Sequence, residues 1–367
     1  MSSDENTSPN GTDIGQKRRK GALQLGARKK QYVAAYRHQA EVSFFCSCTT
    51  DPLVHHGRHF GRTVHALCTV NALLNNSLLR LGELADQPDE AFDNEEHREH
   101  QVFNHLLQMI PGLQERLMEA STEEVKHIAE LIQKGSTNAR SDDTKSLKSA
   151  VLDWITPWGQ VLNPLLARNV KTDCGFHHER TGALLCPAGL DLSSAEYGLR
   201  LIGEMSVSGD HWPIFLYHGY SYDPEDPWNG LLRSALLVSA YKHIFTSPSS
   251  VDKEPKATRS GNAHIHGMTH VTRPSIAYIA TQVRFALSSS PVFSRTDSIT
   301  DSERFYSSIL DLLEDREEVQ EVDDLITWWN RQIFPSYLSV QRPVCKNSAL
   351  ARIKQKRTEL TAAAQNK

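Results

Sequence analysis

The stretch LLRSALLVSAYKHIFTSPSSVDKEPKATRSGNAHIHGMTHV, Leu231 to Val271, contains the two patterns on which the fold prediction rests. Its first half repeats apolar residues at helical spacing, after an Asp226 where an N-cap belongs and a Pro227 at the first helical position. Its second half, after Pro248, is polar and rich in Ser, Lys, Gly and His. The stretch therefore predicts a helix that ends at this proline and a long polar loop over 246–272.

The same helical periodicity recurs in both halves of the chain. Two helices are predicted to begin with capping boxes, Ser121 with Glu124 and Thr300 with Glu303. An extended segment is expected only near 211–218, and residues 46–61 are interpreted as a loop. The fold class is therefore all-α, an irregular helical bundle. The other predicted helices cover residues 29–42, 63–84, 95–110, 121–135, 141–156, 193–205, 273–287, 301–315 and 317–334.

Changes in composition divide the chain into five predicted regions. Two are basic tails: residues 1–31, which are polar, lack apolar periodicity and are expected to be disordered, and residues 341–367. A helical region over 32–156 and a helical domain over 172–340 are joined by a connector at 157–171, which is rich in Pro and Gly.

Net charge is distributed unevenly along the chain. Residues 1–31 carry +4 and residues 342–367 carry +6, so a chain total of −4 leaves −14 for residues 32–341. An acidic body repels a phosphate backbone unless a local patch intervenes, whereas basic tails attract one. The charge pattern predicts electrostatic attachment through the tails.

Composition also predicts an intracellular protein without a membrane span. The six cysteines are too few and too scattered for a disulfide-stapled scaffold. No stretch approaches the roughly 18 consecutive apolar residues of a membrane helix, and the first residues lack the apolar core of a secretory signal.

Two groups of Cys and His residues have the ligand types that zinc prefers. Neither spacing matches a zinc finger or ribbon, so buried thiols and surface imidazoles remain the competing interpretation. We expect no cofactor unless zinc binds at one of the two. The first group is Cys174, His177, His178 and Cys186; the second is Cys46, Cys48, His55, His56, His59, His65 and Cys68.

Three basic residues of the polar loop, Lys253, Lys256 and Arg259, are separated by small residues that let backbone N–H groups approach an anion. They form a candidate anion-binding loop, although the spacing is not that of a phosphate-binding P-loop. A solvated connection between helices is the favoured interpretation, and the anion site is the alternative. His264, His266 and His270 follow in the same loop without a paired carboxylate.

A basic run near the N-terminus is the candidate contact for an import receptor or a nucleic acid. It predicts a nuclear location more strongly than a cytoplasmic one, and RIKQKR near the C-terminus, residues 352–357, supports either use. Its residues are Lys17, Arg18, Arg19, Lys20, Arg28, Lys29 and Lys30.

The sequence contains no G-x-S-x-G nucleophile elbow and no H-E-x-x-H motif. Trp328 and Trp329 are adjacent on a predicted helix, so they cannot both face the core. Because exposed aromatic residues favour partner contacts, this pair is the candidate interface.

Four segments of the second half together resemble a family of fungal proteins, numerous in mushroom-forming species and classed as a domain of unknown function. They are TGALLCPAGLDL, DPEDPWNGLLRSALLVSAYKHIFTSPSS, SIAYIATQVRFALSSS and LITWWNRQIFP, within residues 172–335. The resemblance implies a fungal origin and a mostly helical domain, and it supplies no catalytic residues.

Together these observations favour a non-enzymatic helical module that binds a protein or nucleic-acid partner. A metal-dependent hydrolase or nuclease that uses the His and Cys clusters is the first alternative. An oligomeric structural scaffold is the second, and the sequence does not predict the oligomeric state.

Overall fold

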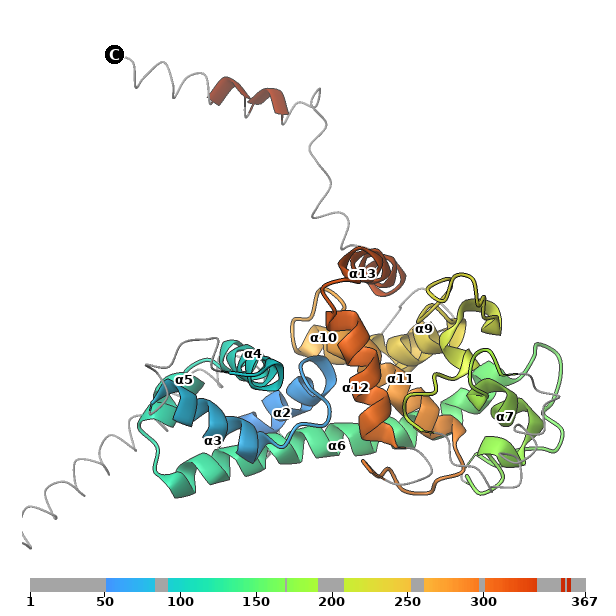
Figure 1. The fold of residues 1–367 in the computed structure, drawn as a ribbon, viewed down its shortest axis with the longest axis horizontal. Helices are drawn as coiled ribbons and strands as arrows, with labels where there is room; N and C mark the ends of the chain where they lie inside the picture. The colour runs from blue at the N-terminus through green and yellow to red at the C-terminus, as the bar shows by residue number, and fades with distance from the viewer. Residues whose placement is uncertain are drawn as a thin grey trace, which may run out of the picture. The chain divides into compact units, whose positions relative to one another are not determined.

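The structure is a computed structural model that describes residues 51–82, 92–168, 170–190, 208–251, 261–296, 301–334, 351–353 and 355–357. In these parts of the chain every regular element is helical, and the sole β-type pairing is an isolated bridge between Pro187 and Pro213. The predicted all-α fold is confirmed (Figure 1). The predicted helices at 29–42 and 193–205 and the N-terminal basic tail lie outside the described residues.

The longest helix, α6 (Thr122–Ile155), is one continuous element where the sequence pattern predicts two. It begins with the predicted capping box, in which the Glu124 N–H donates to Ser121 Oγ at 3.3 Å. It then continues through Gly135 and Ser141, the predicted end and restart. The interpretation of these two residues as helix boundaries was wrong.

Gly135 lies at a close crossing of two helices rather than at the end of a helix. A Cβ atom there would lie 2.1 Å from the carbonyl oxygen of Val54, and one at Gly57 would lie 2.1 Å from that of Ile132. Val54 and Gly57 belong to α2 (Pro52–Thr63), so the interpretation of residues 46–61 as a loop was wrong for this segment. Because neither glycine has a side chain, the backbones of α2 and α6 can touch.

The predicted helix over 63–84 begins later in the structure, because residues 64–69 are not helical. α2 ends at Thr63 and α3 (Val70–Leu81) follows after a short break. His65 stabilises this break, because its Nδ1 accepts the backbone N–H groups of Leu67 at 3.3 Å and Cys68 at 3.0 Å. A side chain that satisfies two backbone donors replaces the helical hydrogen bonds that would otherwise continue.

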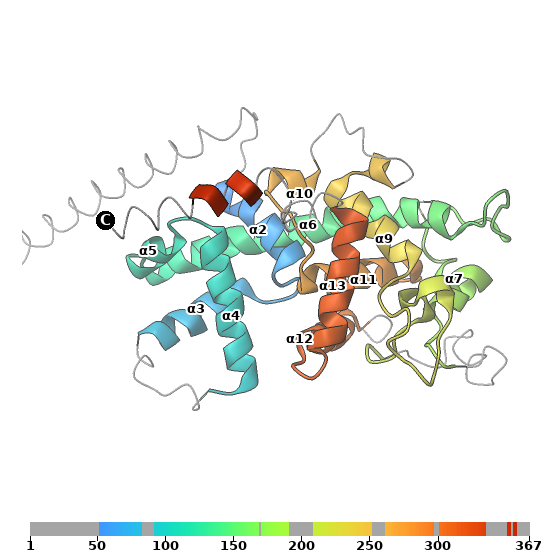
Figure 2. The same cartoon turned by 90° about the horizontal axis from the view of Figure 1, so that it is seen from above.

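Two clusters of buried apolar residues make up the core, and α6 contributes to both. Its first half adds Ile128 and Ile132 to a cluster with α2, α3, α4 (Asn94–Met109) and α5 (Leu113–Met118). Its second half adds Leu147 and Val151 to a larger cluster around α11 (Arg273–Leu287). Figures 1 and 2 show α6 extending past both groups of helices.

The larger cluster surrounds α11, whose residues from Ser275 to Leu287 are all buried. A helix that is buried on every side is a central core element. The helices that pack on it, besides α6, are α7 (Glu179–Leu185), α9 (Ala235–Tyr241) and α12 (Ser302–Glu314), and α13 (Val319–Ile333) packs on α9 and α12. The predicted helices over 273–287 and 317–334 are thereby confirmed.

One predicted helix start in this half was wrong. α9 is capped by Ser234, whose Oγ accepts the Leu237 N–H at 3.3 Å, and not by Asp226. α12 begins after Asp301, and Glu303 in its first turn pairs with Arg295. Thr300, the other member of the predicted capping box, lies outside the described residues, so that box stays a prediction.

Several short turns connect these helices. The segment expected to be extended forms two 3-10 turns, η3 (Ile214–Leu216) and η4 (His218–Tyr220). After α9 the chain makes a π-helical turn, η5 (Lys242–Thr246), which ends before Pro248 as predicted. The remaining short elements are η2 (Gly175–His177), η6 (Pro248–Ser250) and α10 (Asn262–Ile265).

Candidate functional site

Trp328 and Trp329 on α13 have different environments. Trp329 is fully buried, and its indole N–H donates to the carbonyl oxygen of Leu232 at 3.1 Å. Trp328 is only half-buried, and its ring is perpendicular to that of Trp329 with the centroids 5.5 Å apart. One tryptophan therefore anchors α13 in the core while the other reaches the surface.

Trp328 borders an open groove of about 410 Å³, which we name the Trp328 groove. This volume falls within the usual size range of ligand pockets, roughly 300–1,000 Å³. The opposite side of the groove is a single loop, residues 218–233. The groove residues from this loop are His218, Ser221, Asp223, Asn229, Gly230 and Arg233.

The loop has its shape because of an unusual backbone. Gly219, Tyr220, Gly230 and Leu232 all have positive φ, between 55° and 74°. This conformation strains the backbone at Tyr220 and Leu232, since residues with a Cβ avoid positive φ. Strain of this kind concentrates at functional sites, where surrounding contacts hold it in place.

Close contacts at the base of the loop leave no room for a side chain at position 230. The His218 N–H donates to the Gly230 carbonyl oxygen at 2.8 Å. A Cβ atom on Gly230 would lie 3.0 Å from the Cβ of His218. Glycine is therefore required at this position by both space and φ.

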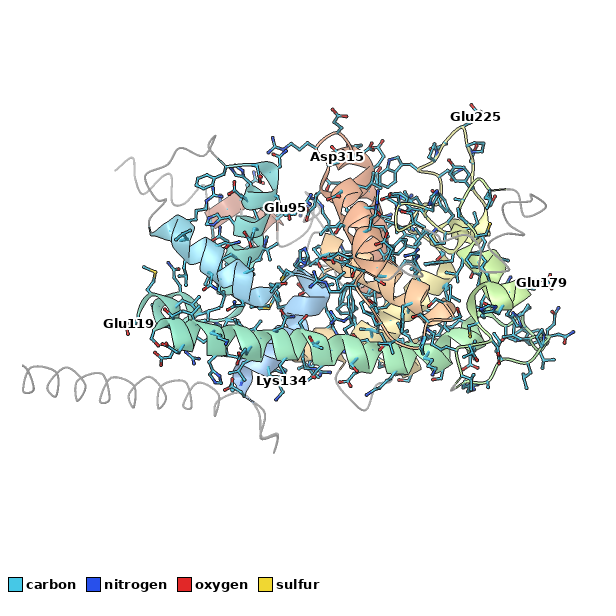
Figure 3. The ribbon with its side chains drawn as sticks, turned by 60° about the horizontal axis from the view of Figure 1, so that its bottom comes forward. Glu95, Glu119, Lys134, Glu179, Glu225 and Asp315 are labelled. Atoms are coloured by element: carbon cyan, nitrogen blue, oxygen red, sulfur yellow. The ribbon has the colours of Figure 1, made fainter. Side chains whose placement is uncertain are left out.

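Two tryptophan side chains fasten the loop to α13. Trp228 Nε1 donates to Glu318 Oε2 at 2.8 Å, and Trp329 Nε1 donates to the Leu232 carbonyl oxygen. Glu225, at the tip of the loop, points away from the helices (Figure 3). Both walls of the groove are thus held in place in the absence of a ligand.

The groove carries one cation without a partner. Within the described residues the guanidinium of half-buried Arg233 makes no hydrogen bond and no ion pair. Asp223 also lines the groove, and its Oδ1 accepts the Glu225 N–H at 3.0 Å. The arrangement can bind a carboxylate at Arg233 while an apolar group packs on the Trp328 ring.

The groove lies in a part of the chain that matches a known protein family. Residues 134–334, a little over half of the chain, match the model of a family of unknown function, DUF6698. The chain belongs to this family. The family match begins at residue 134, earlier than the resemblance noted from residue 172 onward. It therefore also includes the second half of α6, which packs against α11.

No curated protein and no solved structure matches the chain. Among the described residues, no helix combines the length and the apolar character that crossing a membrane requires.

The first predicted zinc group lies inside the DUF6698 region but is not arranged as a metal site. His178 uses both ring nitrogens, since Nε2 contacts the Pro164 carbonyl oxygen at 2.9 Å and Nδ1 accepts the Arg180 N–H. Burial raises the pKa of Cys174, which disfavours the thiolate that zinc binds. No three Cys, His, Asp or Glu residues in the described segments are placed to hold a metal ion, so Cys174, His177, His178 and Cys186 do not converge.

The second group is also dispersed. His65 accepts backbone N–H groups, and burial raises the pKa of the Cys68 thiol to about 12. Cys46 and Cys48 lie outside the described residues. His55 and His59 instead contact His266 of the DUF6698 region, with 4.3 Å between ring centroids in each pair. Sequence patterns did not indicate this contact.

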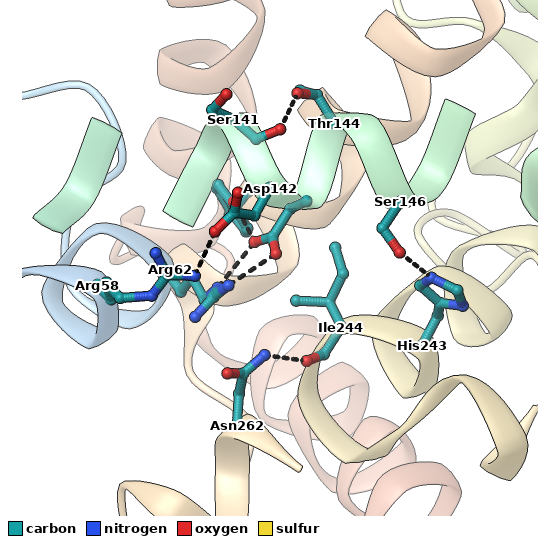
Figure 4. A network of polar contacts seen from close by, with 11 residues as sticks. Arg58, Arg62, Ser141, Asp142, Thr144, Ser146, His243, Ile244 and Asn262 are labelled. Atoms are coloured by element: carbon teal, nitrogen blue, oxygen red, sulfur yellow. Dashed lines mark hydrogen bonds and ion pairs between the residues drawn. The ribbon is translucent and has the colours of Figure 1, made fainter. Parts of the chain in front are cut away.

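Ion pairs join α2 to α6 beside these histidines (Figure 4). Arg62 donates to both carboxylate oxygens of Asp143 at 2.7 Å, and both side chains are buried. Tyr278 of α11 also donates to Asp143, at 2.6 Å. Arg58 binds Asp142 at 2.8 Å at the surface. Because the arginines are paired with the carboxylates, this network holds helices together, although Nη1 of Arg62 is buried without a hydrogen-bond partner among the described residues.

The remaining predicted contacts lie outside the described residues. They are the candidate anion-binding residues Lys253, Lys256 and Arg259, and the N-terminal basic residues Lys17, Arg18, Arg19, Lys20, Arg28, Lys29 and Lys30.

Proposed function

We propose that this protein is a binding module rather than an enzyme, and that it takes a short segment of a partner protein into the Trp328 groove. The segment carries one carboxylate, for Arg233, next to an apolar or aromatic side chain, for Trp328. The observation that carries the proposal is the unpaired guanidinium of Arg233 beside a half-buried tryptophan ring.

Arginine and tryptophan are the residue types that contribute most to binding energy at protein interfaces. A guanidinium binds a carboxylate through two parallel hydrogen bonds, which fixes the orientation of the ligand as well as its charge. The strained loop and its two tryptophan anchors support the proposal further, because a groove that is already ordered loses little entropy on binding.

A protein segment fits this groove better than a nucleic acid. Asp223 lies in the groove with Arg233, and residues 32–341 carry −14, so a phosphate backbone would meet net repulsion. A peptide can align a single carboxylate with Arg233 and keep a neutral or basic remainder beside Asp223. For the same reason we expect strongly acidic peptides to bind poorly.

The basic tails have a separate role in this proposal. Lys17, Arg18, Arg19 and Lys20 would direct nuclear import or attach the protein weakly to nucleic acid. The nuclear location and the fungal origin implied by the resemblance remain predictions.

A library of random peptides displayed on phage, selected on the full-length protein, tests the groove. We expect the selected peptides to contain an acidic residue near an aromatic one. Arg233→Ala and Trp328→Phe should each weaken binding of a selected peptide, Arg233→Ala by roughly tenfold or more.

Arg316→Ala and Trp158→Ala are matched controls, because both residues are exposed and neither lines the groove. They should leave the affinity unchanged. If no peptide is enriched, or if the groove variants and the controls bind equally well, the proposal is wrong.

A further inference from the structure

Three imidazole rings form a stack between α2 and the chain after α10. His55 and His59 are one helical turn apart on α2, and the His266 ring lies between theirs. Its centroid is 4.3 Å from each neighbour, and the interplanar angles are 26° with His55 and 5° with His59. We name these three residues the histidine stack.

The rings are held by one another rather than by hydrogen bonds. No ring nitrogen of the three donates to or accepts from another residue in the described part of the chain. The stacked rings are parallel or nearly so, which does not direct their nitrogens toward one metal ion. Their ionisation state therefore decides whether the contact is attractive.

The histidine stack is partly buried and lies near several cationic side chains. Arg58, Arg62 and His56 share α2 with it, while Asp142 and Asp143 of α6 bind the two arginines. On η5, which packs against α10, His243 contacts Ser146 and carries a lowered pKa because of burial, and Lys242 precedes it. In the described part of the chain, Asp142 and Asp143 are therefore engaged by the two arginines rather than by the imidazoles of the stack.

This environment keeps the rings neutral. Burial, with help from Arg62 and the neighbouring imidazoles, lowers the pKa of His59 to about 4 and that of His266 to about 2. Burial and Arg58 also lower the pKa of His55.

We propose that the histidine stack is a proton-sensitive latch, in which neutral rings hold the His266 segment on α2 and acidification releases it. Two imidazolium rings in contact would repel each other, so protonation of more than one ring opposes the closed arrangement. The rings regain an ordinary pKa near 6.5 once they separate. Release is therefore favoured as the pH falls below about 6.5 and becomes stronger toward pH 4.

The released part is limited by anchors on both sides. Before His266, Asn262 Nδ2 donates to the Ile244 carbonyl oxygen. After it, Val271 N–H donates to Asn330 at 2.8 Å and Thr272 Oγ1 to the Thr63 carbonyl oxygen at 2.8 Å. The latch would therefore free the short stretch between these anchors and expose the face of α2 beneath it. This inference does not depend on the Trp328 groove.

Hydrogen–deuterium exchange of the full-length protein tests the latch, with rates corrected for the intrinsic effect of pH. The Gly267 and Met268 amides, which donate to the carbonyl oxygens of His264 and Ala263, should lose protection by tenfold or more between pH 7.5 and pH 5. Buried α11 should keep its protection over the same range.

Two variants separate titration from stacking. His266→Phe keeps an aromatic ring in the stack but cannot be protonated, so its protection should no longer depend on pH. His270→Phe, in the same loop but outside the stack, should respond as the unchanged protein does. If His266→Phe does not fold, His59→Phe is the second variant; it removes one of the two contacts between titratable rings, so the pH response should be weaker than in the unchanged protein but not lost. An unchanged pH response in the folded phenylalanine variant, or none in the unchanged protein, would overturn the proposal.

Discussion

The buried Trp329 side chain donates a hydrogen bond to Leu232, a residue that itself has a positive φ of 55°. A core helix thus stabilises a backbone conformation that leucine avoids. Since Leu232 precedes Arg233 in the loop of the Trp328 groove, the shape of the groove depends on the buried Trp329 beneath it. This relationship can be tested without a ligand.

Trp329→Phe should lower the free energy of unfolding by about 2–4 kcal/mol, because it leaves a cavity and an unpaired buried carbonyl. Urea denaturation provides the measurement. Trp158→Phe is the control, since Trp158 is fully exposed and should change stability by less than about 0.5 kcal/mol. Equal effects of the two substitutions would contradict the anchoring role.

Gly230→Ala should be more destabilising than Gly219→Ala. Both glycines have positive φ, but an added Cβ contacts His218 only at position 230 and has open space at position 219. At Gly219 we expect the free energy of unfolding to fall by about 1 kcal/mol, from the backbone strain alone. At Gly230 we expect a larger loss, because the added Cβ also contacts His218. Thermal unfolding of both variants gives the difference, and a larger loss at Gly219 would be inconsistent with this geometry.

Gly135→Ala distinguishes a helix crossing from a helix end. In an uncrowded helix the substitution would stabilise the protein by about 1 kcal/mol through helix propensity. Since the added Cβ would lie 2.1 Å from the Val54 carbonyl oxygen, we expect a loss of several kcal/mol instead. Ser141→Ala, at an exposed position of the same helix, should be neutral or slightly stabilising.

His65 should make the protein sensitive to acid. Its Nδ1 accepts two backbone N–H groups and so must stay unprotonated, and burial with Arg98 and Arg295 nearby lowers its pKa to about 4. The unfolded chain takes up this proton near pH 6.5, before the folded protein does. Its contribution is therefore fully present above pH 6.5 and is lost as the pH falls toward 4, by about 3 kcal/mol in all.

His65→Asn is the matching variant, because an amide oxygen can accept the same N–H groups without titrating. Unfolding free energies measured from pH 7.5 to pH 4 should fall less steeply in this variant than in the unchanged protein. Identical slopes would show that His65 does not contribute.

Replacing Lys17, Arg18, Arg19 and Lys20 with alanine should reduce nonspecific binding to DNA and flatten its dependence on salt. Fluorescence anisotropy of a labelled duplex over a salt series measures both. Arg233→Ala should leave DNA binding unchanged, because the groove and the tails have separate roles in our proposal. A DNA affinity that survives loss of the four charges would direct attention to the body of the protein.

Local signals in the sequence predicted the elements that depend on local interactions. The α11 and α13 helices were predicted from apolar periodicity, and Ser121 was recognised as a cap because its partner lies three residues away. Gly135 was misinterpreted as a helix end because a glycine at a helix crossing looks like one until the partner helix is known, and α2, which contains Gly57, was interpreted as part of a loop. Both errors come from contacts between distant segments.

The candidate site was predicted in part for the same reason. Adjacent Trp328 and Trp329 cannot share an environment, and that conclusion needs only helical geometry. Arg233 was not predicted as a site residue, because its place in the groove depends on a loop with positive φ values. No local sequence signal indicates these values. The contact of His266 with His59 was also missed, since it joins residues far apart in the sequence.

The ion pair of Arg62 and Asp143 crosses the boundary of the family match, which begins at Lys134. A fragment trimmed to residues 134–334 would keep the aspartate and lose the arginine, leaving an uncompensated carboxylate against Tyr278. It would also begin in the middle of α6, without the turns that start that helix. A fragment that begins no later than α2 keeps both the arginine and the complete α6, and we expect it to be more stable than residues 134–334.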